Sequence, residues 1–150
     1  MVNDQDSIQE STGYWVTRLA RSMERDFEKR LEPVGITRGA FAVLGAILQE
    51  KKTKPAELAA FLGVDGAAVT RHLDRVENQG LIERKPSVTD RRSTNISLTA
   101  EGRRAVRRGR ASSKATNEKF TADLTATEVD HLRSIIQIML AESDVAVSDI

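Results

Sequence analysis

The 150-residue sequence contains no cysteine, only three prolines and few aromatic residues, namely four Phe, one Tyr and one Trp. The absence of cysteine excludes a disulfide framework, a thiolate metal site, a cysteine nucleophile and a cysteine redox switch. Because aromatic residues make up only 4% of the chain, the core must consist mainly of Leu, Val, Ile and Ala. A chain of this length buries about 70% of its unfolded surface and needs no disulfide or metal to fold.

Long apolar runs and catalytic motifs are also absent from the sequence. The longest apolar stretches are far too short to span a membrane, and residues 1–10 lack the basic and apolar regions of a secretory signal. His72 and His131 stand alone, without a HExxH pair or a carboxylate cluster, and no GxxxxGK[ST] or GxGxxG loop is present. We expect a cytoplasmic protein that is not an enzyme and has no cofactor, metal or membrane partner.

The charge is unevenly distributed, although the net charge is only +1. Between Gly66 and Arg110 eleven basic residues stand against five acidic ones, whereas the rest of the chain has twelve basic and seventeen acidic residues. A basic middle between acidic ends is typical of a phosphate-binding surface on an acidic body. Ordinary solvated helix faces would give the same counts, so charge alone leaves both interpretations open.

Apolar residues recur at every fourth position between residues 11 and 31, which predicts a long amphipathic helix. These residues are Trp15, Leu19, Met23, Phe27 and Leu31. Pro33 and Gly35 end this helix, and Thr37 caps a second one that runs to about Glu50.

Two short helices separated by a glycine turn are predicted next. The first begins at Pro55 and ends at Gly63, and Asp65 caps the second, which runs from Gly66 to about Gln79. This arrangement is typical of a helix-turn-helix unit.

After Gly80 the apolar period changes from that of a helix to that of a strand. Residues 81–86 and 93–98 predict two strands joined by a polar turn, and Thr94, Ile96 and Leu98 alternate with polar residues in the second. The hairpin makes the unit a winged helix-turn-helix. Thr99 then caps a helix to about residue 120, and Thr125 with Glu128 forms the capping box of a last helix with a wide apolar stripe. We therefore predict a mainly α fold with a small β-wing, in a single domain over residues 1–150 whose winged helix spans 36–99.

The helix from Gly66 has the features of a DNA-reading helix. Small residues at its start allow close approach to DNA, and polar and basic residues lie off the inward stripe of Val69, Leu73 and Val76. Such residues can reach base edges and phosphates in the major groove, although an ordinary surface helix is the alternative. The expected DNA contacts on this helix are Gly66, Ala67, Thr70, Arg71 and Arg75.

Four cations accompany the predicted hairpin. Arg84 and Lys85 lead into its turn, and Arg91 and Arg92 lie at or just past it. A thin basic wing can reach the minor groove or the flanking phosphates. We expect Asp90 to hold one of these arginines through a charged hydrogen bond and so to shape the wing tip, rather than to act in catalysis.

These motifs resemble those of the MarR family of winged-helix transcription factors, over nearly the whole chain and in the same element order. Residues 90–99 fit the family's D-x-R-x5-L-T wing signature at Asp90, Arg92, Leu98 and Thr99. Residues 69–75 and 80–82 resemble the family's recognition helix and its exit. The resemblance implies that Thr70, Arg71 and Arg75 contact bases or phosphates in the major groove, and that Arg92 enters the minor groove.

The resemblance further implies a homodimer, in which residues 8–35 and 100–146 interlock, bound to a pseudo-palindromic operator in double-stranded DNA. Such regulators are usually repressors, and many respond to a small-molecule effector between the dimerisation helices and the winged helix. Tyr14, Trp15 and Phe41 are candidates for that crevice, although core or interface packing is the interpretation that we favour for each.

Two departures from the family pattern are visible, and one rival function remains. Lys54 stands where the family often has a Ser or Thr cap, with Thr53 as a substitute, and the lack of cysteine excludes the family's peroxide-sensing branch. The rival is a winged helix used only for protein contact. The cations of the wing and of the recognition helix argue against it, because the cores of protein interfaces are depleted in charge.

Overall fold

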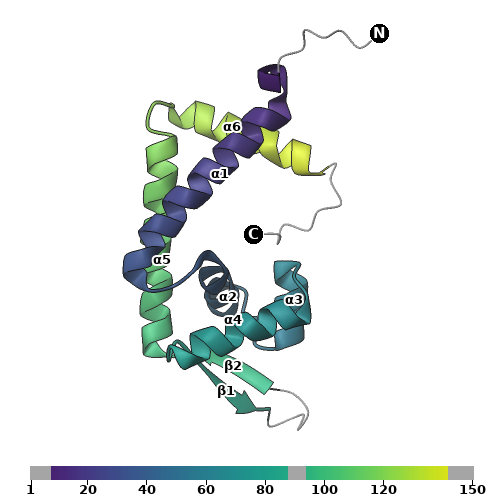
Figure 1. Ribbon diagram of the computed structural model, residues 1–150, viewed down its shortest axis with the longest axis vertical. Coiled ribbons are helices and arrows are strands. Elements are labelled where there is room, and N and C mark those ends of the chain that lie inside the picture. The colour runs from purple at the N-terminus through teal and green to yellow at the C-terminus, as the bar shows by residue number, and fades with distance from the viewer. Residues whose placement is uncertain (1–7, 88–93, 142–150) are drawn as a thin grey trace.

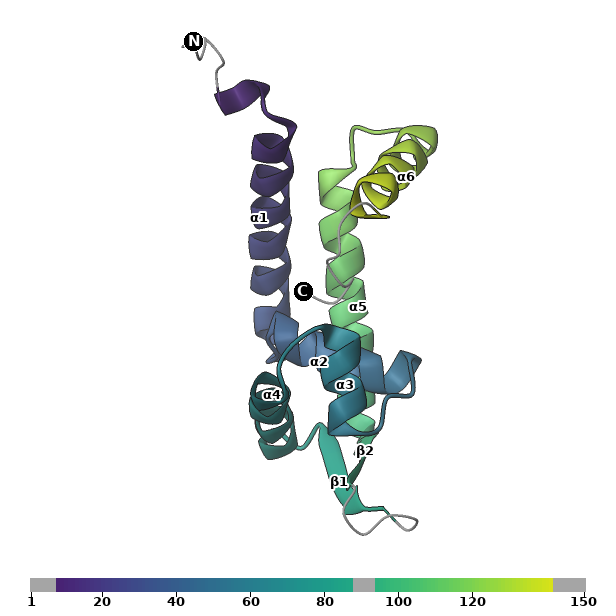
Figure 2. The same ribbon diagram turned by 90° about the vertical axis from the view of Figure 1, so that its right-hand side faces the viewer.

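The computed structural model describes residues 8–87 and 94–141, and it is mainly helical with one two-stranded sheet (Figures 1 and 2). The winged-helix lobe lies at one end of α5, and the first helix α1 and the last helix α6 lie toward its other end. The predicted fold class is confirmed. In chain order the elements are η1 (Ile8–Glu10), α1 (Thr12–Leu31), η2 (Glu32–Val34), α2 (Arg38–Gln49), α3 (Pro55–Leu62), α4 (Gly66–Asn78), β1 (Ile82–Pro86), β2 (Thr94–Leu98), α5 (Ala100–Phe120) and α6 (Ala126–Ala141).

The predicted helix caps are present at α2, α4 and α5. Thr37, Asp65 and Thr99 each accept a hydrogen bond from the backbone N–H three residues later, at 3.2, 2.6 and 3.0 Å respectively. Each bond satisfies one of the N–H groups that have no partner inside the helix. The predicted capping box of α6 also forms, since Thr125 N–H donates to the Glu128 carboxylate and Glu128 N–H donates back to Thr125 Oγ1.

The start of α3 differs from the prediction. Lys54 is its N-cap residue, and Thr53 does not cap the helix. Instead the carboxylate of Glu57 accepts hydrogen bonds from the N–H groups of Thr53 and Lys54, at 3.2 and 3.3 Å. Glu57 thus satisfies the N–H groups at and just before the N-cap, whereas the cap that we expected of Thr53 would have accepted a hydrogen bond from an N–H group inside the helix.

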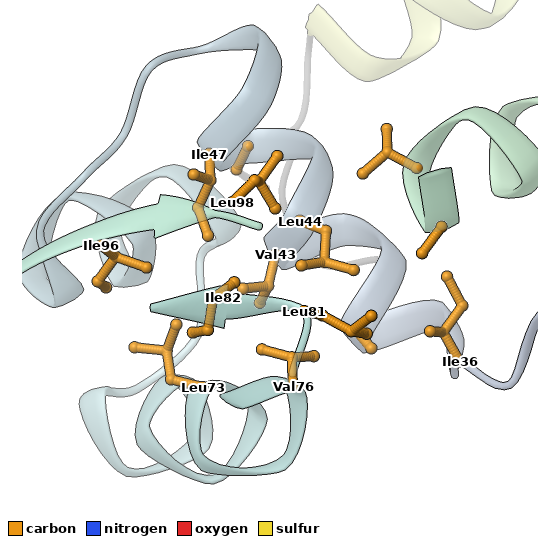
Figure 3. Close-up of a cluster of buried hydrophobic side chains, with 14 of the residues drawn as sticks. Ile36, Val43, Leu44, Ile47, Leu73, Val76, Leu81, Ile82, Ile96 and Leu98 are labelled. Carbon is orange, nitrogen blue, oxygen red and sulfur yellow. The ribbon is translucent and has the colours of Figure 1, made fainter. Parts of the chain in front are cut away.

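The core of the winged-helix lobe lies between α2, α4 and the hairpin (Figure 3). Leu73 and Val76 of α4 point toward Ile82 of β1, with Val43 and Leu44 of α2 beyond them. Val69, Leu73 and Val76 are each at most 1% exposed, which confirms the inward stripe of this helix. Contacts of β2 with α2 and of β1 with α4 hold the hairpin in a fixed position relative to α4.

The strands pair antiparallel, with Ile82 opposite Leu98 and Arg84 opposite Ile96. Successive side chains of a strand point to opposite faces. Arg84 therefore lies on the same face of the hairpin as Ile82, which is buried, and Lys85 lies on the other face.

Polar contacts join α1, and the short η2 turn that follows it, to α5. Asp26 accepts hydrogen bonds from Lys119 Nζ at 2.5 Å, Arg30 Nε at 2.7 Å and Thr116 Oγ1 at 2.9 Å. Lys119 and Arg30 hold the pKa of Asp26 well below its usual range, because both favour the charged carboxylate. Nearer the lobe, Arg108 donates to the carbonyl oxygen of Pro33 at 2.7 Å. These contacts set the position of α1 along α5.

Among the described residues, no single helix is both long and apolar enough to cross a membrane. Two consecutive segments, Thr12–Val34 and Arg38–Gln49, bent by 76° between them, are long and apolar enough only when taken together.

Candidate nucleic-acid interface

The outward face of α4 carries the five predicted contact residues. Gly66, Ala67, Thr70, Arg71 and Arg75 are all exposed. At the first position of the helix, a Cβ atom added to Gly66 would meet nothing within 4 Å, so the backbone there is open to a partner. The N-terminus of a helix also carries a partial positive charge. The structure thus brings together small residues, two guanidinium groups and a helix N-terminus on one free face.

The wing lies beside α4 (Figure 2), and its two described cations have different surroundings. The Lys85 side chain is 73% exposed and pairs at 3.0 Å with Glu83, on the same face of its own strand. The Arg84 side chain is only 24% exposed and forms ion pairs with two carboxylates of α4, Asp74 and Glu77. Asp90, Arg91 and Arg92 lie outside the described residues, so their roles remain predictions.

The pairing of Arg84 is the main feature of the site that we did not predict. One sequence signal points to it, because Arg84 stands two residues after the buried Ile82 and so shares the inward face of the strand. The identity of its partners depends on how β1 packs against α4, which no spacing in the sequence reports.

A basic loop also lies next to the wing. The N–H of Ile96 in β2 donates a hydrogen bond of 2.8 Å to the carbonyl oxygen of Thr53. This bond places the loop between α2 and α3 alongside β2. Lys51 and Lys54 of this loop are exposed, so the structure places further positive charge beside the hairpin.

The two histidines have different surroundings. A Cβ atom added to Gly39 in α2 would overlap the ring of His72, so the imidazole packs closely against that helix. His131 is exposed on α6. Within residues 8–87 and 94–141, no group of three or more His, Cys, Asp or Glu side chains is arranged to hold a metal ion.

A cavity of about 470 Å³ lies between the winged-helix lobe and the long helices. Phe27 of α1, Phe41 of α2 and Phe61 of α3 line it, together with Ser113 of α5. Phe27 and Phe41 meet edge to face at 5.4 Å between ring centroids. Arg38, also at the cavity, pairs with Glu24 at 3.0 Å and with Glu28 at 3.6 Å.

Of the three aromatic residues considered for an effector crevice, Phe41 lines this cavity. Tyr14 and Trp15 do not; they lie in the first turn of α1 and meet edge to face at 5.2 Å. Trp15 is 52% exposed, which agrees with an interface role better than with the crevice.

Comparisons with known proteins identify similar chains. The model of the MarR family matches residues 34–93. The multiple antibiotic resistance protein MarR of Salmonella typhimurium is 31% identical over 129 residues, which cover 85% of this chain and 90% of that protein. An HTH-type transcriptional repressor of Mycobacterium tuberculosis is 29% identical over 125 residues, or 83% of this chain and 90% of the repressor.

Solved structures agree with these matches. The crystal structure of a mutant MarR from E. coli complexed with operator DNA has a TM-score of 0.76 and 30% sequence identity, covering 85% of this chain and 92% of that one. The similarity therefore spans the outer helices as well as the winged helix.

Proposed function

Because the chain belongs to the MarR family, we propose that it acts as a homodimer on a pseudo-palindromic operator in double-stranded DNA, where it represses transcription. It is a DNA-binding transcriptional regulator, as its relatives are, and they are not enzymes. One observation carries the proposal: the exposed Thr70, Arg71 and Arg75 of α4 lie over a buried apolar stripe and beside a basic wing. The similarity to a structure with operator DNA favours this function over a wing used only for protein contact. The proposal also assigns the protein to the cytoplasm, since the DNA that it binds lies there.

In the proposed complex, the N-terminal half of α4 enters the major groove. Gly66 and Ala67 permit close approach, and Thr70, Arg71 and Arg75 contact base edges or phosphates. The wing follows the flanking backbone, with Lys85 and Arg91 on phosphates. Arg92 enters the minor groove and Asp90 shapes the wing tip.

Exposed apolar side chains on the outer helices support the dimer. No residue of α6 is buried, and Trp15, Val16 and Leu19 of α1 are each more than 40% exposed. Large contiguous apolar surfaces are rare on monomeric proteins, and a twofold dimer would cover the same surface on both copies. The exposed large apolar residues of α6 are Leu132, Ile135, Ile136, Ile138, Met139 and Leu140.

The proposal includes a small-molecule effector site in the cavity lined by Phe27, Phe41 and Phe61. Its volume of about 470 Å³ falls within the range of small-molecule sites. A ligand there would touch the long helices α1 and α5 as well as α2 and α3 of the winged helix. A bound ligand would therefore be placed to change the position of the winged helix relative to the long helices.

Selection of bound sites from genomic fragments, followed by footprinting, tests the proposal. We expect protection of two half-sites about 10 base pairs, or roughly 34 Å, apart. Ile138→Glu, on the exposed face of α6, should dissociate the dimer and abolish operator binding, whereas Arg133→Gln on the same helix should change neither. A wild-type protein that is monomeric at micromolar concentration by light scattering, or a footprint on a single half-site, would contradict the dimeric mode.

A further inference from the structure

Arg84 bridges the wing and the recognition helix. Its Nη2 atom pairs with Asp74 Oδ1, and its Nε atom lies 2.9 Å from Glu77 Oε2. Both acids are on α4, whereas Arg84 is in β1. The guanidinium is enclosed, since the Arg84 side chain is 24% exposed against 55% for Asp74 and 40% for Glu77. A side chain held in this way points at the helix and is not free to follow a phosphate.

The two acids lie in the part of the molecule that approaches DNA. Asp74 is exposed on α4 between the proposed contact residues Arg71 and Arg75. Along α4, Arg71 and Arg75 stand against Asp74 and Glu77, so the helix by itself has no net formal charge from these groups. Uncompensated carboxylates next to DNA phosphates would oppose binding.

We propose, building on the function proposed above, that Arg84 is a positioning residue for DNA binding. It neutralises Asp74 and Glu77 and ties strand β1 to α4, rather than contacting phosphate itself. The positive charge of α4 toward DNA then depends on a cation from the wing, and the two DNA-binding elements act as one unit. Lys85 lies on the other face of the same strand, 73% exposed beside Glu83, and is the residue of these two cations that can reach DNA.

A mutant cycle tests whether Arg84 acts by neutralising Asp74 and Glu77 or by contacting a DNA phosphate directly. Arg84→Met is expected to weaken binding at least tenfold to a duplex of about 30 base pairs recovered from a random pool with the wild-type protein. In an Asp74→Asn, Glu77→Gln background the same change should cost less than about threefold, because no carboxylate remains to be masked. An equal loss in both backgrounds would mean that Arg84 contacts phosphate, and would overturn the proposal.

Lys85→Met is the matched control, since it removes one cation from the neighbouring position. Its effect should be the same in both backgrounds, as expected for a direct contact that is independent of Asp74 and Glu77. Melting temperatures should stay within about 4 °C of the wild type for all variants, because ion pairs whose carboxylates remain largely open to solvent, as those of Asp74 and Glu77 do, stabilise the fold only slightly. A much larger fall for Arg84→Met would show that it acts through the fold as a whole.

A DNA-free measurement keeps the two proposals separate. Because the chain has no cysteine, spin labels can be attached specifically to Asn78→Cys and Lys85→Cys. Diluting the labelled chains with an excess of unlabelled protein leaves few dimers with two labelled copies, so that the labels report the distance between α4 and β1 within one protomer. Arg84→Met should broaden the distribution of this distance, and an unchanged distribution would overturn the tie between wing and helix. If the wild-type protein selects no DNA sequence, the proposed function fails, while the label distances still decide whether Arg84 holds β1 against α4.

Discussion

Gly102 lies where the first turn of α5 meets the start of the wing, and no side chain fits there. A Cβ atom at this position would overlap the carbonyl oxygen of Leu81 and lie 3.0 Å from its carbonyl carbon and 3.1 Å from Leu98 Cδ2. The same Leu81 oxygen accepts a hydrogen bond of 3.1 Å from Thr99 N–H. Because the obstacle is backbone, Gly102→Ala requires α5 or the chain entering β1 to shift.

Gly102→Ala should change the free energy of unfolding in two opposite ways, by a gain in helix propensity and by a larger loss from overpacking. Ala is favoured over Gly inside a helix by about 1 kcal/mol. Overpacking costs about 1–3 kcal/mol, with about 1 kcal/mol more if the Thr99 hydrogen bond lengthens. We therefore expect a net loss of about 1–3 kcal/mol in the free energy of unfolding, or a fall of roughly 3–10 °C in melting temperature.

Gly45→Ala in α2 is the matched control. Its Cβ atom would lie 3.6 Å from Gln49 Nε2, an ordinary contact with a flexible side chain. It should raise the melting temperature by about 2–4 °C through helix propensity alone. Circular dichroism melts at equal protomer concentration give both values, since dimerisation makes the melting temperature depend on concentration. A Gly102→Ala protein as stable as the wild type would refute the close packing of α5 on Leu81.

Three further predictions concern DNA binding and pH. Arg71→Ala should weaken operator binding by about 1–3 kcal/mol and relax discrimination at one position per half-site; titrations on operator and single-base variants check this, and Lys114→Ala, an exposed cation on α5, should have no effect. Affinity should fall about 10³–10⁵-fold between about 50 and 200 mM salt if the dimer neutralises about 6–10 phosphates, and a flat log–log plot would refute a phosphate-dominated interface. Because the pKa of Asp26 is lower in the folded than in the unfolded protein, its carboxylate stabilises the fold above the unfolded pKa of about 3.9, and this is lost as pH falls toward the folded pKa. The melting temperature of the Asp26→Asn variant should therefore fall less than that of the wild type as the pH drops below about 4. The melting temperature of Asp130→Asn, a control on α6, should fall as much as that of the wild type.

Local features of the sequence were sufficient to predict the elements of this fold. The caps Thr37, Asp65 and Thr99 each act within three residues of their own position. The inward stripe of α4 follows from the 3.6-residue period, and the hairpin follows from alternation around a polar turn. The exposed face of α4, with Thr70, Arg71 and Arg75, followed from the same period.

The tertiary structure alone decided which distant groups meet. Arg84 and Lys85 are adjacent cations, and we assigned both to DNA, yet one is held by two acids of α4 and the other is exposed. Asp26 meets Lys119 across two helices that are far apart in the sequence, and a bond from Ile96 brings the Thr53 loop to the wing. The physical reason is the range of the interactions. Helix caps and apolar periodicity depend on neighbours a few residues away, so the local sequence is enough to predict them. These contacts depend on how complete helices and strands pack against one another, which no local stretch of sequence determines by itself.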